Sequence, residues 1–104
     1  MANEADGPGV LTLPELVRLG NAEQVLSMLT KGLQGHPPKV VLKLDATVLR
    51  DFDSAVLAVI LECKRRALAL GHALELVAAP AKLEDLARVY GLTELLWPER
   101  TSGA

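Results

Sequence analysis

The sequence has few of the cysteine, histidine and aromatic residues on which small disulfide-bonded folds and catalytic sites usually depend. It contains one cysteine, Cys63, so neither a disulfide framework nor a paired-cysteine redox motif can form within the chain. Its aromatic residues are one Phe, one Tyr and one Trp, whereas half of its 104 residues are hydrophobic, so the core must be built from Leu, Val and Ala. Neither His36 nor His72 has neighbours at metal-ligand spacing, which predicts that the chain binds no metal.

The sequence also has no excess of positive charge. The net charge of −2 and the pI of about 5.6 argue against a nucleic-acid partner. The clustered cations Lys64-Arg65-Arg66 are expected to form the solvated face of a helix. No apolar run approaches the roughly 20 residues that span a bilayer, and Met1 to Gly9 does not resemble a signal peptide. We therefore expect a soluble, cytoplasmic protein with no membrane span.

Enzymatic motifs are missing as well. The sequence has no GxGxxG or GxxxxGK[ST] phosphate-binding motif and no GxSxG nucleophile motif. Asp53 cannot serve as a base for the adjacent Ser54 in the way that a histidine does. Asp45, Asp51 and Asp53 could in principle gather a divalent cation, but three acids in one loop are more often turn and cap residues. The sequence therefore predicts a protein that is not an enzyme and uses no cofactor.

What the sequence does contain is an alternation of apolar strands and amphipathic helices. It predicts an α/β fold with a small, mostly parallel sheet of about four strands and helices packed against it. The almost wholly apolar third and fourth strands suggest a sheet covered on both faces. We expect strands at residues 10–13, 16–19, 39–44 and 73–78, and helices at residues 22–34, 54–70, 82–90 and 92–96.

Two further expectations concern organisation. Residues 16–19 are interpreted as a strand that pairs with the first strand or continues it, although the same residues could begin a helix. A single domain is expected at residues 10–97, between a disordered N-terminus at 1–9 and a C-terminal tail at 98–104.

The junction Asp53-Ser54, which we call the elbow, lies between the third strand and the longest helix. A serine directly before a helix is a good N-cap, because its hydroxyl can accept hydrogen bonds from free N–H groups of the first turn. The same turn favours negative charge, including that of a phosphate. Two interpretations stay open, namely that Ser54 is only a cap, or that it is also a functional site.

The surface of the longest helix favours a binding role. Helical spacing places Val56, Leu57, Ile60, Cys63, Ala67 and Leu70 in the core, with Cys63 as a small buried hydrophobe. The opposite face is small near its start, which would let another backbone approach closely, with apolar residues on its flanks. The alternative is that the chain's own terminal segments cover this face. The predicted partner-binding residues are Asp53, Ser54, Ala55, Ala58, Val59, Leu61 and Glu62. An exposed apolar face would also allow a weak homodimer.

The order of these motifs resembles that of STAS domains, the fold shared by anti-sigma factor antagonists and segments of anion transporters. The segments that carry the resemblance are Val40–Asp45, Phe52–Ala58, Gly71–Val77, Pro80–Leu83 and Leu86–Leu96. The short length and the Ala81-Lys82-Leu83 to Tyr90-Gly91-Leu92 ending look most like the MlaB group, the small cytoplasmic subunits of the Mla phospholipid transporters that maintain outer-membrane lipid asymmetry in Gram-negative bacteria.

The MlaB resemblance implies a non-catalytic protein that docks on the ATPase subunit of an ABC transporter, at the inner face of the inner membrane. The wider family implies an alternative, an anti-sigma factor antagonist in which Ser54 is phosphorylated by an anti-sigma factor kinase. In either branch the resemblance places the functional spot at Asp53 and Ser54. A third interpretation is a small-molecule or lipid sensor that uses the same elbow.

One departure from the family bears on the choice. Sigma-pathway members usually continue the pair with Ser-Gly-Leu-Gly, whereas this chain has Ala55-Val56-Leu57-Ala58. The loss of glycine stiffens the first turn, and we expect the β-branched Val56 to obstruct a kinase's approach. The sequence therefore favours constitutive docking over phosphorylation.

Overall fold

The structure is a computed structural model that describes residues 9–37 and 40–98. The expected disordered segment and tail therefore lie, apart from Gly9 and Pro98, outside the described residues. In chain order the elements are β1 (Val10–Thr12), β2 (Leu16–Val17), the 3-10 helix η1 (Leu19–Asn21), α1 (Ala22–Gln34), β3 (Val41–Asp45), β4 (Asp51–Phe52), α2 (Ala55–Ala69), β5 (Ala73–Val77), α3 (Ala81–Val89) and α4 (Thr93–Leu96).

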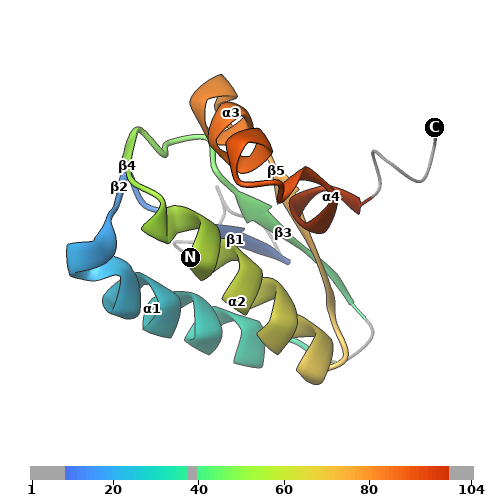
Figure 1. Cartoon of the computed structure of the whole chain (residues 1–104). Helices are drawn as coiled ribbons and strands as arrows, with labels where there is room; N and C mark the ends of the chain where they lie inside the picture. The colour runs from blue at the N-terminus through green and yellow to red at the C-terminus, as the bar shows by residue number, and fades with distance from the viewer. Residues whose placement is uncertain (1–8, 38–39, 99–104) are drawn as a thin grey trace.

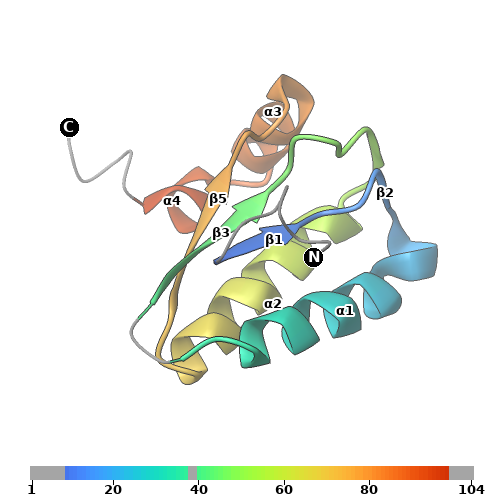
Figure 2. The same ribbon diagram turned by 180° about the vertical axis from the view of Figure 1, so that it is seen from behind.

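The strands form a three-stranded sheet in the order β1-β3-β5 and a separate pair, β2-β4. Every strand pair in the described chain is parallel, which confirms the expected architecture. Helices α1 and α2 lie side by side across one face of the larger sheet (Figure 1). Figure 2 shows the same arrangement from behind, with the strands in front of these two helices. The core therefore lies between the sheet and this helix pair.

The predicted partner of β2 is wrong. Instead of joining β1, Leu16 and Val17 pair in parallel with Asp51 and Phe52. The chain leaves the larger sheet at Pro14, which has no N–H to donate to a ladder. The carbonyl of Glu15 then accepts the N–H groups of Arg50 and Asp51, at 2.9 and 3.0 Å. As a result, β2 lies beside the segment that leads into α2.

The expectation that the sheet is covered on both faces is also wrong. Strands β3 and β5 alternate between buried and exposed positions along their length, as expected for a sheet with one packed face. Val41 and Ala73 made the runs look wholly apolar, yet both lie on the exposed face. The buried positions are Leu42, Leu44, Leu74 and Leu76, and the exposed ones are Val41, Lys43, Ala73 and Glu75.

The predicted helices are confirmed, with small differences at their ends. α2 is followed by Gly71 with φ of 87° and α3 by Gly91 with φ of 71°, backbone conformations that terminate helices and suit glycine. Leu70, which is expected in the core, is exposed, and so is Tyr90 at the end of α3. Both are C-cap residues that lie beyond the last regular turn, so the helical spacing no longer applies to them.

Candidate functional site at the start of α2

The elbow lies at the edge of the sheet where the parallel strands end. β4 runs into Asp53, whose N–H donates to the carbonyl of Val17 at 3.3 Å, and α2 begins at Ala55. The segment that follows β5 reaches the same region, since α3 lies close to the start of α2 (Figure 1). Residues from the segment after β3 and from the segment after β5 therefore line one groove at this edge.

Asp53, and not Ser54, supplies the side chain that caps α2. Its Oδ1 accepts the N–H of Ala55 at 2.9 Å, and its Oδ2 accepts the N–H of Leu19, in η1, at 3.1 Å. These two bonds lower the pKa of Asp53, with the bond from Leu19 as the larger cause. The carboxylate therefore fixes the start of α2 and the position of η1 together.

The prediction that the Ser54 hydroxyl caps the helix is wrong. Ser54 already has helical backbone angles, φ −63° and ψ −15°, and makes no capping hydrogen bond. A capping side chain normally comes from a residue with extended backbone, from which it can reach back to the first N–H groups. Ser54 is exposed instead, as is Ala58 one turn later, while Ala55 is half-buried. The small outward face expected at the start of the helix is thus present at Ser54 and Ala58.

Two strongly exposed apolar residues lie near Asp53, and no pattern in the sequence predicts a role for either. Leu19 is 79% exposed and donates its N–H to Asp53. Val89, at the end of α3, is also 79% exposed and lies across a shallow groove from Asp53. That groove is lined by Phe52, Asp53, Lys82, Asp85, Leu86 and Val89. We call Leu19, Asp53, Ser54, Ala58 and Val89 the elbow surface.

The structure does not bring all the predicted binding residues together. Val59 is only 3% exposed and belongs to the hydrophobic core, so its expected place on an outer flank is wrong. Leu61 lies about two helical turns from Ser54 and lines a different groove, with residues of β5 and α4. Only Asp53, Ser54, Ala55 and Ala58 remain at the start of the helix.

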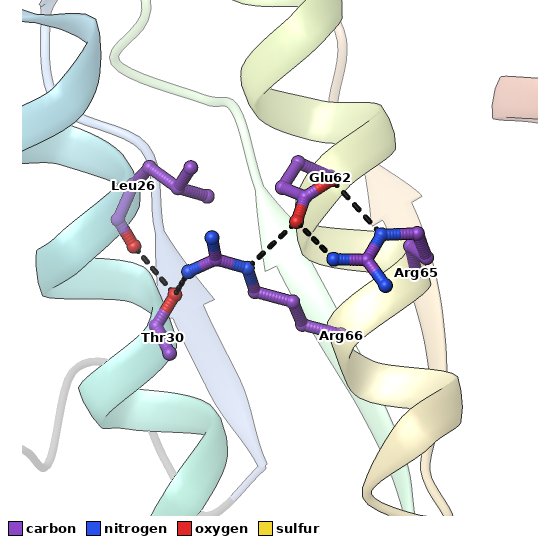
Figure 3. Close-up of polar contacts among 5 residues, drawn as sticks. All are labelled: Leu26, Thr30, Glu62, Arg65 and Arg66. Atoms are coloured by element: carbon purple, nitrogen blue, oxygen red, sulfur yellow. Dashed lines mark hydrogen bonds and ion pairs between the residues drawn. The ribbon is translucent and has the colours of Figure 1, made fainter.

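Glu62, the last predicted binding residue, is engaged in a polar cluster between α2 and α1 (Figure 3). Its carboxylate accepts from Arg65 Nε at 3.0 Å and from Arg66 Nε at 2.8 Å. Arg66 also donates to the hydroxyl of Thr30, which in turn donates to the carbonyl of Leu26, each at 2.8 Å. The hydrogen bonds from Arg65 and Arg66 lower the pKa of Glu62 to about 2. Glu62 therefore forms ion pairs with two arginine side chains, Arg65 and Arg66.

Val56 does not obstruct access to Ser54. Its side chain is completely buried, so the expectation that it would block a kinase is wrong. Position 56 is part of the core stripe, and a β-branched residue there points away from the exposed hydroxyl. The steric objection to phosphorylation is thereby removed.

The three loop aspartates are directed at separate partners. Asp45 accepts the N–H of Thr47 at 2.8 Å, and Asp51 pairs with Arg18 at 2.6 Å, whereas Asp53 caps α2. Within residues 9–37 and 40–98, no group of three or more potential metal ligands is found. None of the helices described in these ranges is long and apolar enough to cross a bilayer.

Comparison of the sequence with known protein families gives one match. A family model described as "Mlab, STAS domain" matches residues 1–97, a range that includes every element described above. No curated protein matches the chain significantly. The parallel sheet with helices packed against it is the architecture expected from that family match.

Proposed function

The chain belongs to the STAS domain family of the MlaB type, and from this premise we propose that it is a non-catalytic subunit that binds the ATPase of a phospholipid ABC transporter. In this proposal residues 10–97 act as one domain, and the partner holds the protein at the cytoplasmic side of the inner membrane. The protein supports assembly or activity of the transporter, which serves outer-membrane lipid asymmetry.

One observation carries the proposal, namely two exposed aliphatic side chains that flank a small and rigid helix start. Leu19 and Val89 stay in water in the isolated chain, and full burial of such a side chain contributes about 1.5–3 kcal/mol. Ser54 and Ala58 are small enough to let a partner's backbone approach the helix between Leu19 and Val89. Because Asp53 already fixes this region, little conformational entropy is lost on binding.

Co-purification tests the proposal directly. A tagged chain expressed in Gram-negative cells should recover an ABC-type ATPase, and Leu19→Glu or Val89→Glu should lower that recovery at least about tenfold, which corresponds to about 1.4 kcal/mol. Leu68→Glu is the matched control, because Leu68 is similarly exposed but lies outside the elbow surface. The proposal fails if no ATPase is recovered, or if the two elbow variants recover as much as the control.

The state of Ser54 favours a second candidate, an anti-sigma factor antagonist regulated by phosphorylation. The Ser54 side chain is exposed and forms no capping bond, so a kinase could reach its hydroxyl. A phosphate there would lie at a helix N-terminus, which favours negative charge, but beside the carboxylate of Asp53, which repels it. Intact-mass measurement after growth under stress, with Ser54→Ala as control, distinguishes the two. Phosphate on Ser54, together with release of a kinase-like partner by Ser54→Asp, would favour the antagonist.

A further inference from the structure

A second groove lies on the other half of α2, away from the elbow surface. Leu61 and Leu68 are spaced seven residues apart on α2, and helical geometry places them on one face. Together with residues at the start of β5 and in α4, they line a groove of about 400 Å³. The apolar residues that line this groove are Leu61, Leu68, Ala73, Leu74, Leu95 and Pro98.

The two walls of the groove leave apolar side chains in water. Leu68 on α2 is 71% exposed, and Leu95 on α4 is 58% exposed. The groove is thus apolar, partly enclosed and within the size range of small-molecule sites, roughly 300–1,000 Å³. It shares no lining residue with the elbow groove.

The two charged residues that line this groove are both cations. Lys64 and Arg65 come from the same face of α2 as the two leucines and are the charged residues that line it. Arg65 pairs with the carboxylate of Glu62, and Lys64 Nζ donates to the carbonyl of Leu74 at 2.7 Å. The guanidinium of Arg65 has five N–H donors and uses two of its nitrogens on Glu62, which leaves it able to donate to a second anion.

We propose that this groove binds a long-chain fatty acid, with the alkyl chain between Leu68 and Leu95 and the carboxylate at Arg65. An alkyl chain needs no hydrogen-bonding partners, which suits walls made of leucine, alanine and proline. An extended peptide would have to leave backbone N–H and C=O groups unpaired against those walls. The inference is independent of the proposed function, since it uses a different face of α2.

Titration of the purified full chain with dodecanoate, below its micelle-forming concentration, tests the inference. Binding should be saturable at one molecule per chain and should raise the melting temperature. Trp97, the sole tryptophan, adjoins Pro98 and provides a fluorescence signal. Dodecanol and dodecyltrimethylammonium, which share the chain but lack the anionic group, should bind at least about tenfold more weakly, a difference of about 1.4 kcal/mol. Equal binding of the cationic amphiphile would overturn the inference.

Three variants locate the site. Leu68→Glu should abolish dodecanoate binding, whereas Leu19→Glu, on the elbow surface, should leave it unchanged. Arg65→Gln should weaken dodecanoate at least about tenfold and leave dodecanol unaffected, because only the carboxylate contacts the guanidinium. Dodecanoate binding that survives Leu68→Glu contradicts the inference. So does a wild-type dimer that Leu68→Glu dissociates, since the occupant of the groove would then be a second copy of the chain.

Discussion

The carboxylate of Asp53 binds the backbone of Leu19, a residue 34 positions earlier in the chain. Its Oδ2 accepts the Leu19 N–H at 3.1 Å, while its Oδ1 accepts the N–H of Ala55 at 2.9 Å. One side chain therefore joins the start of α2 to η1. The geometry of the elbow surface depends on this link, because it positions the exposed Leu19 beside Asp53.

Replacement of the two elbow residues should have unequal effects on stability. Ser54→Ala removes a side chain that makes no capping bond, so the free energy of unfolding should change by no more than about 0.5 kcal/mol. Asp53→Ala removes both bonds to Leu19 and Ala55 and should lower the melting temperature clearly. Thermal unfolding followed by circular dichroism measures both. A larger loss for Ser54→Ala would show that the hydroxyl, and not the carboxylate, caps the helix.

The contribution of Asp53 should also depend on pH. Because the folded-state pKa of Asp53 lies below its ordinary value of 3.8, its stabilisation is fully present above that value and is lost as the pH falls through the folded-state pKa. The difference in melting temperature between wild type and Asp53→Asn should therefore be constant near neutral pH and shrink in acid. Both proteins retain Glu62, so its titration cancels in the comparison. A difference that grows below pH 3.8 would contradict the assigned shift.

Local patterns were sufficient to predict most of the fold. Gly71 and Gly91 follow α2 and α3 because glycine adopts positive φ at low cost, and helical spacing predicts the core position of Cys63. These features depend on residues close together in the sequence. The MlaB-type family match, likewise, was anticipated from the order of short motifs.

The parts of the site that depend on distant contacts could not be predicted. Leu16 and Val17 pair with β4 because the chain turns away from the larger sheet at Pro14. No local sequence pattern predicts that pairing. Leu19 consequently reaches Asp53, which no spacing rule indicates. Val59 was misplaced for a related reason, since the apolar first half of α2 packs over a wider arc than one stripe. Burial on a flank depends on neighbouring elements and not on the helix alone.

Cys63 should be chemically inert in the native protein. Burial raises the pKa of its thiol from 9.0 to about 11, so the reactive thiolate fraction near pH 8 falls about a hundredfold, in addition to steric protection. Iodoacetamide should label the native chain at least that much more slowly than the chain in denaturant. Equal labelling rates in the two states would place the thiol at the surface.

Gly32 should tolerate alanine but not a larger residue. A Cβ at this position would lie 2.5 Å from Cδ2 of Leu11, the flexible end of a half-buried side chain. For Gly32→Ala, the helix-propensity gain of up to about 1 kcal/mol should roughly offset the shift of Leu11. Gly32→Val adds bulk against β1 and should cost about 1–3 kcal/mol in chemical denaturation. The control is Gly20→Val, where no atom lies within 4 Å, and an equal loss there would point to a general glycine effect.

The Glu62 cluster should stabilise the α1–α2 pair in a salt-dependent way. Glu62→Gln leaves Arg65 and Arg66 side by side without their counter-charge, and it should lower the melting temperature. The loss should diminish in 1 M salt, where the screening length falls to about 3 Å. Asp85→Asn is the control, because Asp85 pairs with one exposed arginine, Arg88, and such pairs contribute little.

The same cluster makes a prediction in acid. The pKa of Glu62 is about 2 in the folded chain against an ordinary value of 4.5, so its stabilisation is present above pH 4.5 and is lost as the pH falls toward 2. The melting temperatures of wild type and Glu62→Gln should therefore converge between these two values. Convergence that is complete already at pH 4.5 would mean that neither arginine lowers the pKa of Glu62, and that the contacts in Figure 3 do not persist in solution.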